Sequence, residues 1–261
     1  MELAIRTKTI VRTIIIAVVL ITLAGLAARF ALYMWGEGAL LRPLGLFDVG
    51  RENSIPTWFE SMQFMLCSVL LAVVARSNGQ RGEQYSKHWG VLSIIFLYMS
   101  LDEVATIHET TGAELQRVLY ATTGFTPSGA ISFFWVVPAS IFVLVVALSY
   151  IGFLVHLPRS TRRRFVFAAA VFLLGALGFE MLTAEVVSSS GAIASWVASS
   201  FGGEIDRGTA NAIPTILKGG QTSIEEMLEM LGLTAFVWAL LAHISSYVDE
   251  DINVRVRTDK S

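Results

Sequence analysis

The residues of this sequence that could do chemistry are carboxylates, joined by one histidine, near the ends of long apolar segments. The densest group is Ser100–Glu109, which carries Asp102, Glu103, His108 and Glu109. Further glutamates lie at the ends of other apolar segments: Glu60, Glu180, Glu185, Glu225, Glu226 and Glu229. Carboxylate oxygens with a single imidazole suit Mn, Fe, Zn or Ca, so the pattern predicts a divalent-cation site.

Angular position on a helix assigns roles within this group. At about 100° per residue, Asp102 and Glu109 share one face with Thr106, while His108 and Glu103 flank that face on opposite sides. We therefore predict Asp102 and Glu109 as metal ligands, and His108 or Glu103 as a general acid or base. The remaining predicted ligands come from other segments: Glu180, Glu229, Glu60 and Glu225.

Depth in a membrane supports one shared site. At 1.5 Å rise per residue, Asp102 and Glu180 lie about 20–22 Å from the inner starts of their segments. Coming from the outer side, Glu60 and Glu229 lie roughly 6 and 10 Å from the starts of theirs. In a hydrocarbon core about 30 Å thick, these acids meet within about one helical turn of the same plane.

Other interpretations of the acids remain open. Thr222-x-x-Glu225 and Ser223-x-x-Glu226 match capping boxes, so both glutamates could close a helix start. The acids could also be partly protonated or line a water-filled vestibule. Arg29 is the one basic residue at similar height and could pair with them, although one guanidinium cannot neutralise so many carboxylates.

The elements that must position these groups are six apolar segments, each about long enough to cross a membrane. They indicate an all-α polytopic bundle in a single transmembrane domain, with spans at about 13–35, 56–74, 89–107, 131–155, 165–187 and 224–243. Ser54 and Pro56 predict the start of the second span, as N-cap and first-turn residue. The outer stretch 108–130 should continue the third helix for some turns, and the pieces 192–201 and 213–217 suggest an interfacial or re-entrant segment.

Basic residues set the orientation, with both termini on the cytoplasmic side. One side holds Arg6, Lys8, Arg12, Arg76, Arg81, Lys87, Arg159, Arg162, Arg163, Arg164, Arg255, Arg257 and Lys260, and the other only Arg42, Arg51, Arg117, Arg207 and Lys218. The first segment could instead be a cleaved signal peptide, because basic residues precede an apolar run. That run continues past Arg29 to Trp35, which favours a retained span.

Composition agrees with a membrane protein. Of the 261 residues, 54% are hydrophobic and only 15% are charged, and the mean hydropathy is +0.63. The formal net charge of -2 argues against nucleic acid as a partner, which would need a basic stripe. Cys67 is the one cysteine and lies in an apolar run, so no intrachain disulfide can form and a buried structural role is expected.

Two stretches resemble a group of uncharacterised bacterial multi-pass membrane proteins. The first is Phe47–Phe59, which contains the outer turn Asn53-Ser54-Ile55-Pro56-Thr57-Trp58-Phe59, and the second is the Ser-Leu-Asp-Glu … Ile-His-Glu stretch of Ser100–Glu109. The resemblance implies a bacterial inner-membrane protein and supplies no activity.

Three functions follow as hypotheses. The first is a metal-dependent enzyme acting on a lipid-like or quinone-like substrate near the outer leaflet. The second is the vestibule of a cation or proton transporter or channel. The third is a structural or assembly subunit. Val166–Leu174 and Ala235–Ala242 are almost wholly apolar in the inner half, which weakens the transporter hypothesis.

Overall fold

Helices form all the regular secondary structure of the computed structural model, which describes residues 7–35, 42–51, 53–201 and 207–258. The principal ones are α1 (Thr7–Trp35), α2 (Ile55–Gln80), α3 (Ser86–Ala105), α4 (Ile107–Thr123), α5 (Val136–Ser149), α6 (Ile151–His156), α7 (Arg159–Leu173), α8 (Glu180–Ser188), α9 (Ser190–Ser200) and α10 (Arg207–Thr258). Short helical turns are η1 (Arg42–Phe47), η2 (Gly129–Ile131) and η3 (Leu174–Phe179), the last a π-helical segment.

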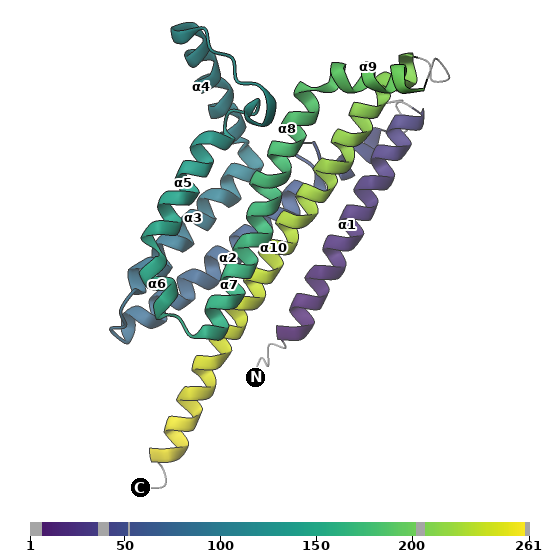
Figure 1. Cartoon of the computed structure of the whole chain (residues 1–261). Helices are drawn as coiled ribbons and strands as arrows, with labels where there is room; N and C mark the ends of the chain where they lie inside the picture. Colours follow the sequence, from purple (N-terminus) through teal and green to yellow (C-terminus); the bar gives the residue numbers. More distant parts are fainter. Residues whose placement is uncertain (1–6, 36–41, 52, 202–206, 259–261) are drawn as a thin grey trace.

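The long helix α10 is the centre of the bundle. It packs against α1, α2, α7, η3, α8 and α9. The first turns of α1 and the last turns of α10 lie at one end of the bundle (Figure 1). At the opposite end, α9 lies across the bundle and α4 projects from it. We call this opposite end the α9 end of the bundle.

The helices fit a membrane protein. Within the described ranges, four helices are long and apolar enough to cross a membrane, and a fifth span results if the bent pair α3 and α4 counts as one. Of the six predicted segments, 131–155 is divided between η2, α5 and α6, so the structure leaves the count of six unconfirmed. The predicted segment 165–187 lies within the α7–η3–α8 stretch, which is one continuous candidate.

The core lies between α2, α3, α6, α7 and α10, toward the end away from α9. Phe64, Leu71, Trp89, Phe153 and Leu240 are at most 2% exposed. Cys67 is fully buried among them, as predicted. This apolar core occupies the end of the bundle away from α9, whereas the acidic side chains lie nearer the α9 end.

The start of α10 corrects one interpretation. The helix already runs through Thr222 and Ser223, whose hydroxyls donate to the carbonyls of Lys218 and Gly219 one turn earlier. Residues inside a helix cannot cap its start, so the capping-box interpretation of Glu225 and Glu226 is wrong. The piece 213–217 likewise belongs to α10, whereas 192–201 falls largely in α9.

Candidate metal centre

The start of α2 positions Glu60. The Ser54 hydroxyl accepts a hydrogen bond from the backbone N–H of Thr57 at 3.3 Å, and Pro56 occupies the first turn, as the sequence predicts. One turn further, Glu60 is only 1% exposed. Neither of its carboxylate oxygens accepts a hydrogen bond from any residue that the structure describes.

Paired serines hold α3 against α2 and thereby place Glu103. Ser61 and Ser100 each donate a hydroxyl hydrogen bond to the other's carbonyl, at 2.7 and 2.9 Å. Two turns further along, Ser68 and Ser93 repeat the exchange at 2.8 Å in both directions. Small hydroxyl residues let membrane helices approach closely and bond across the interface. Glu103, three residues after Ser100, therefore comes beside Glu60.

A buried amide fixes α10 against the same helix. The side-chain nitrogen of Gln63 donates to the Met230 carbonyl at 3.1 Å and to the Thr234 hydroxyl at 2.9 Å. Nearby, Gly232 meets α7 so closely that an added Cβ would lie 2.6 Å from the backbone nitrogen of Phe172. This close approach holds α10 directly against the backbone of α7.

Three carboxylates from three helices meet in this frame. One oxygen each of Glu60, Glu103 and Glu226 lies within 4.8 Å of the others. We call these residues the carboxylate triad. The Glu229 carboxyl also lies beside Glu60. Glu60 is buried and Glu103 and Glu226 are half-buried, so like charges at this spacing repel, and the arrangement needs a cation or bound protons.

The histidine belongs to a different contact. Asp102 accepts hydrogen bonds from the backbone N–H of His108 at 2.8 Å and pairs with its Nδ1 at 2.7 Å. This contact spans a break at Thr106, which has a φ of 50° and from which α4 turns 75° away from α3. His108 lies beyond the end of α3, and its pKa is raised. Burial alone would lower this pKa, but the hydrogen bond to Asp102 and the nearby negative charges outweigh the effect of burial.

A second pair of acids lies between α8 and α10. Glu180 accepts a hydrogen bond from the Trp135 indole at 3.1 Å, and its carboxyl lies beside that of Glu225. Glu185 instead bonds to Ser189 and is turned toward Gly129. Glu180 is therefore the fifth-span acid that reaches α10, as its depth predicts.

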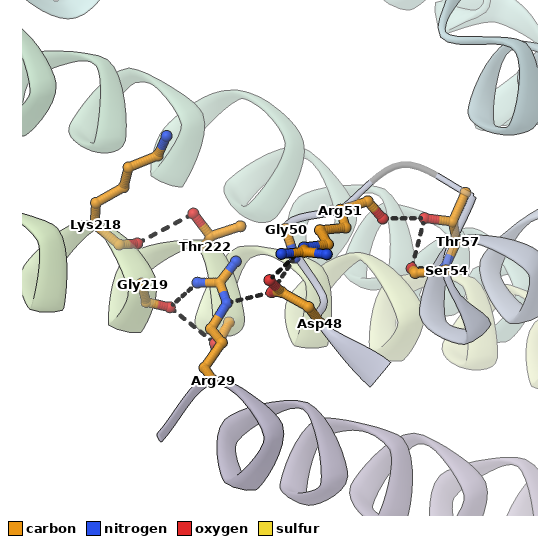
Figure 2. Close-up of polar contacts among 10 residues, drawn as sticks. Arg29, Asp48, Gly50, Arg51, Ser54, Thr57, Lys218, Gly219 and Thr222 are labelled. Atoms are coloured by element: carbon orange, nitrogen blue, oxygen red, sulfur yellow. Dashed lines mark hydrogen bonds and ion pairs between the residues drawn. The ribbon is translucent and has the colours of Figure 1, made fainter. Parts of the chain in front are cut away.

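Arg29 contacts Asp48 and Gly219 rather than the acidic cluster, as Figure 2 shows. Its guanidinium contacts Asp48 at 2.5 Å and donates to the Gly219 carbonyl at 2.7 Å. Gly50 makes room, since a Cβ there would lie 1.9 Å from an Arg29 nitrogen. Arg29 thus ties α1 to residues 42–51 and to α10, and the pairing expected with the acidic cluster is replaced by one with Asp48.

Comparison with known proteins identifies a family. A family model described as "Domain of unknown function (DUF8692)" matches residues 13–244. The chain belongs to this family. Neither the curated proteins nor the solved structures contain a match. Membership in DUF8692 agrees with the resemblance to an uncharacterised group and assigns no activity to the chain.

For this DUF8692 member, the structure distributes the predicted site residues among three contacts. Glu60 belongs to the triad and Glu229 lies beside it. Glu180 and Glu225 lie beside each other and near Glu229, and Asp102 binds His108. The bend at Thr106 interrupts the helical face that Asp102 and Glu109 were expected to share, and Glu109 is exposed. Glu103, predicted as an acid or base, brings an oxygen to the carboxylate triad.

Sequence reasoning did not include Glu226 among the candidate ligands because the pattern Ser223-x-x-Glu226 resembles a cap. The apolar helical run that continues on both sides of it was the available signal against a helix start there.

Proposed function

We propose that this protein binds a divalent cation between membrane-spanning helices, through Glu60, Glu103 and Glu226. The supporting observation is the convergence of one oxygen from each residue within 4.8 Å, with Glu60 buried and lacking a hydrogen-bond partner among the described residues. A buried carboxylate without partners is costly, and a cation would supply them. Glu229 would complete or balance the charge of the site.

The ligand chemistry narrows the cation. The triad offers only carboxylate oxygens, because the one nearby imidazole, His108, is engaged with Asp102. Hard oxygen ligands suit Ca²⁺ or Mn²⁺ better than Zn²⁺, which prefers nitrogen and sulfur.

A binding site open on one side fits better than a conduction path. Below the triad, Gln63 and Thr234 bond to each other, and apolar side chains such as Phe64, Leu71 and Leu240 then fill the bundle. A transporter would need polar groups through this half. In the proposed topology the termini are cytoplasmic, the membrane is a bacterial inner membrane, and the triad faces its outer side.

An enzymatic use of the cation is the second candidate. Asp102 orients the His108 ring as a carboxylate orients a general base, and both lie on the helix pair that carries Glu103. A lipid-like substrate would reach such a site from within the bilayer. Hydrolysis of a lipid analogue by the metal-loaded protein and its loss in His108→Gln would support this use, and unchanged activity in that variant would overturn it.

Metal analysis tests the proposal directly. Protein purified in detergent without chelators should carry a divalent metal, and chelated protein should rebind Mn²⁺ or Ca²⁺. Glu226→Gln should lower the affinity by more than tenfold, since a buried charge loses one of its partners. Glu114→Gln is the matched control, because Glu114 is exposed on α4 and pairs with Arg117. Metal-free wild-type protein that rebinds neither ion would exclude the site.

A further inference from the structure

Unpartnered oxygens also occur on α8 and α10, on residues outside the carboxylate triad itself. Glu225 is 7% exposed and Thr183 is 2% exposed. Among the residues that the structure describes, nothing hydrogen bonds to Oε2 of Glu225, Oγ1 of Thr183 or Oε1 of Gln221, although all three atoms are buried. A buried polar atom without a hydrogen-bond partner destabilises the folded protein, so three of them on neighbouring turns of two helices need a reason.

Thr183 is the most informative of these residues. A helical threonine ordinarily satisfies its hydroxyl by donating to a carbonyl one turn earlier. Thr122, Thr222 and Thr234 all do so in this protein. The Thr183 hydroxyl has no such bond to any described residue, so it is available for another partner.

Helix register brings the oxygens to one level. The chain ascends α8, crosses in α9 and descends in α10, so α8 and α10 pack antiparallel (Figure 1). The contact of Glu180 with Glu225 fixes their register. From it, Thr183 lies about 4.5 Å toward the α9 end on α8, and Gln221 lies about 6 Å toward that end on α10. Residues three or four apart share a helix face, so the register puts Thr183 on the side of α8 that carries Glu180 and Gln221 on the side of α10 that carries Glu225.

We propose that Glu180, Thr183, Gln221 and Glu225 form a second cation site, of the hard, oxygen-liganded class to which Ca²⁺ belongs. Carboxylates and a side-chain amide oxygen are usual Ca²⁺ ligands, and the hydroxyl adds a further neutral oxygen. Two carboxylates balance the charge of a divalent ion. The Trp135 indole, which donates to Oε1 of Glu180, orients that carboxylate as an outer-sphere partner does.

The site is tested by the stoichiometry of Ca²⁺ binding to the detergent-purified full chain, measured by equilibrium dialysis. Wild-type protein should bind two Ca²⁺ ions. The double variant Thr183→Val with Gln221→Met, which preserves shape and removes the neutral oxygens, should weaken one of them at least tenfold. Thr183→Ser, which keeps the hydroxyl, should bind both. The double variant should fold, because it removes unsatisfied atoms and leaves the triad intact.

The outcomes separate this proposal from the proposed function. One bound ion that is lost in Glu226→Gln and kept in the double variant would overturn the second site alone. One ion that is lost only in the double variant would overturn the triad alone, and no binding would overturn both. Ca²⁺ should also change tryptophan emission in wild-type protein and much less in Trp135→Phe. An equal change in both would count against an ion beside Glu180.

Discussion

Replacing Glu103 by glutamine distinguishes a ligand from an acid or base. The change keeps the shape of the side chain and removes its charge. At 4.8 Å, two carboxylates repel by about 3.5 kcal/mol in an effective dielectric constant of about 20. Glu103 takes part in two of the three pairs of the triad, and full ionisation would cost about 10 kcal/mol in all, which is comparable with the entire stability of a typical domain.

The sign of the effect therefore depends on the cation. With Mn²⁺ present, Glu103→Gln should bind it on the order of a hundredfold more weakly, since breaking a buried charge pair costs about 3 kcal/mol. The thermal midpoint with Mn²⁺ should fall accordingly, because an ion bound only to the folded state stabilises that state. In chelator, the variant should be at least as stable as wild-type protein, because repulsion is relieved.

Thermal unfolding in detergent, with Mn²⁺ or with chelator, measures both effects on one preparation, and Glu114→Gln should match wild-type protein in each. Wild-type Mn²⁺ affinity in Glu103→Gln would refute its role as a ligand. An equal loss of stability with and without metal would show that Glu103 has a structural role only.

Three further outcomes are expected. Gly232→Ala should lower the thermal midpoint, since overpacking against the backbone of Phe172 costs about 1–3 kcal/mol, whereas Gly79→Ala, with nothing within 4 Å of the new Cβ, should not. His108→Gln should destabilise the protein at low pH and lose its effect as the pH rises through the raised pKa of His108, because the protonated ring provides the stabilisation; a midpoint difference independent of pH would contradict this. A reporter that works only in the cytoplasm should be active when it is fused after Ser261. Activity there of a reporter that works only outside the cytoplasm would contradict the predicted topology.

Hydropathy and depth predicted more of this structure than angular position did. Glu60, Glu180 and Glu229 lie on apolar helices at the α9 end, as counting residues along each span predicts. Angular predictions failed where the backbone departs from a straight helix. Thr106 adopts a φ of 50°. Glycine or asparagine normally occupies this conformation, so a threonine in the sequence does not predict it.

The sequence also does not predict which side chains pair between neighbouring helices. Nothing in the sequence pairs Ser61 with Ser100, and only that pairing shows that Glu103 meets Glu60. Local patterns misled at Ser223, where a capping box lies inside a long helix. Such patterns describe one turn of chain, whereas the triad is a property of three helices at once.

The π-helical segment Leu174–Phe179 carries an evolutionary consequence. A π-helical turn accommodates one residue more than an α-helical turn, and each added residue rotates the following side chains by about 100°. Removing one codon within this segment would turn Glu180 away from α10 while leaving the apolar length of the helix almost unchanged. A single-residue insertion in an ordinary membrane helix is thus enough to bring a carboxylate to face Glu225, and aligned relatives one residue shorter here should lack an acid at that position.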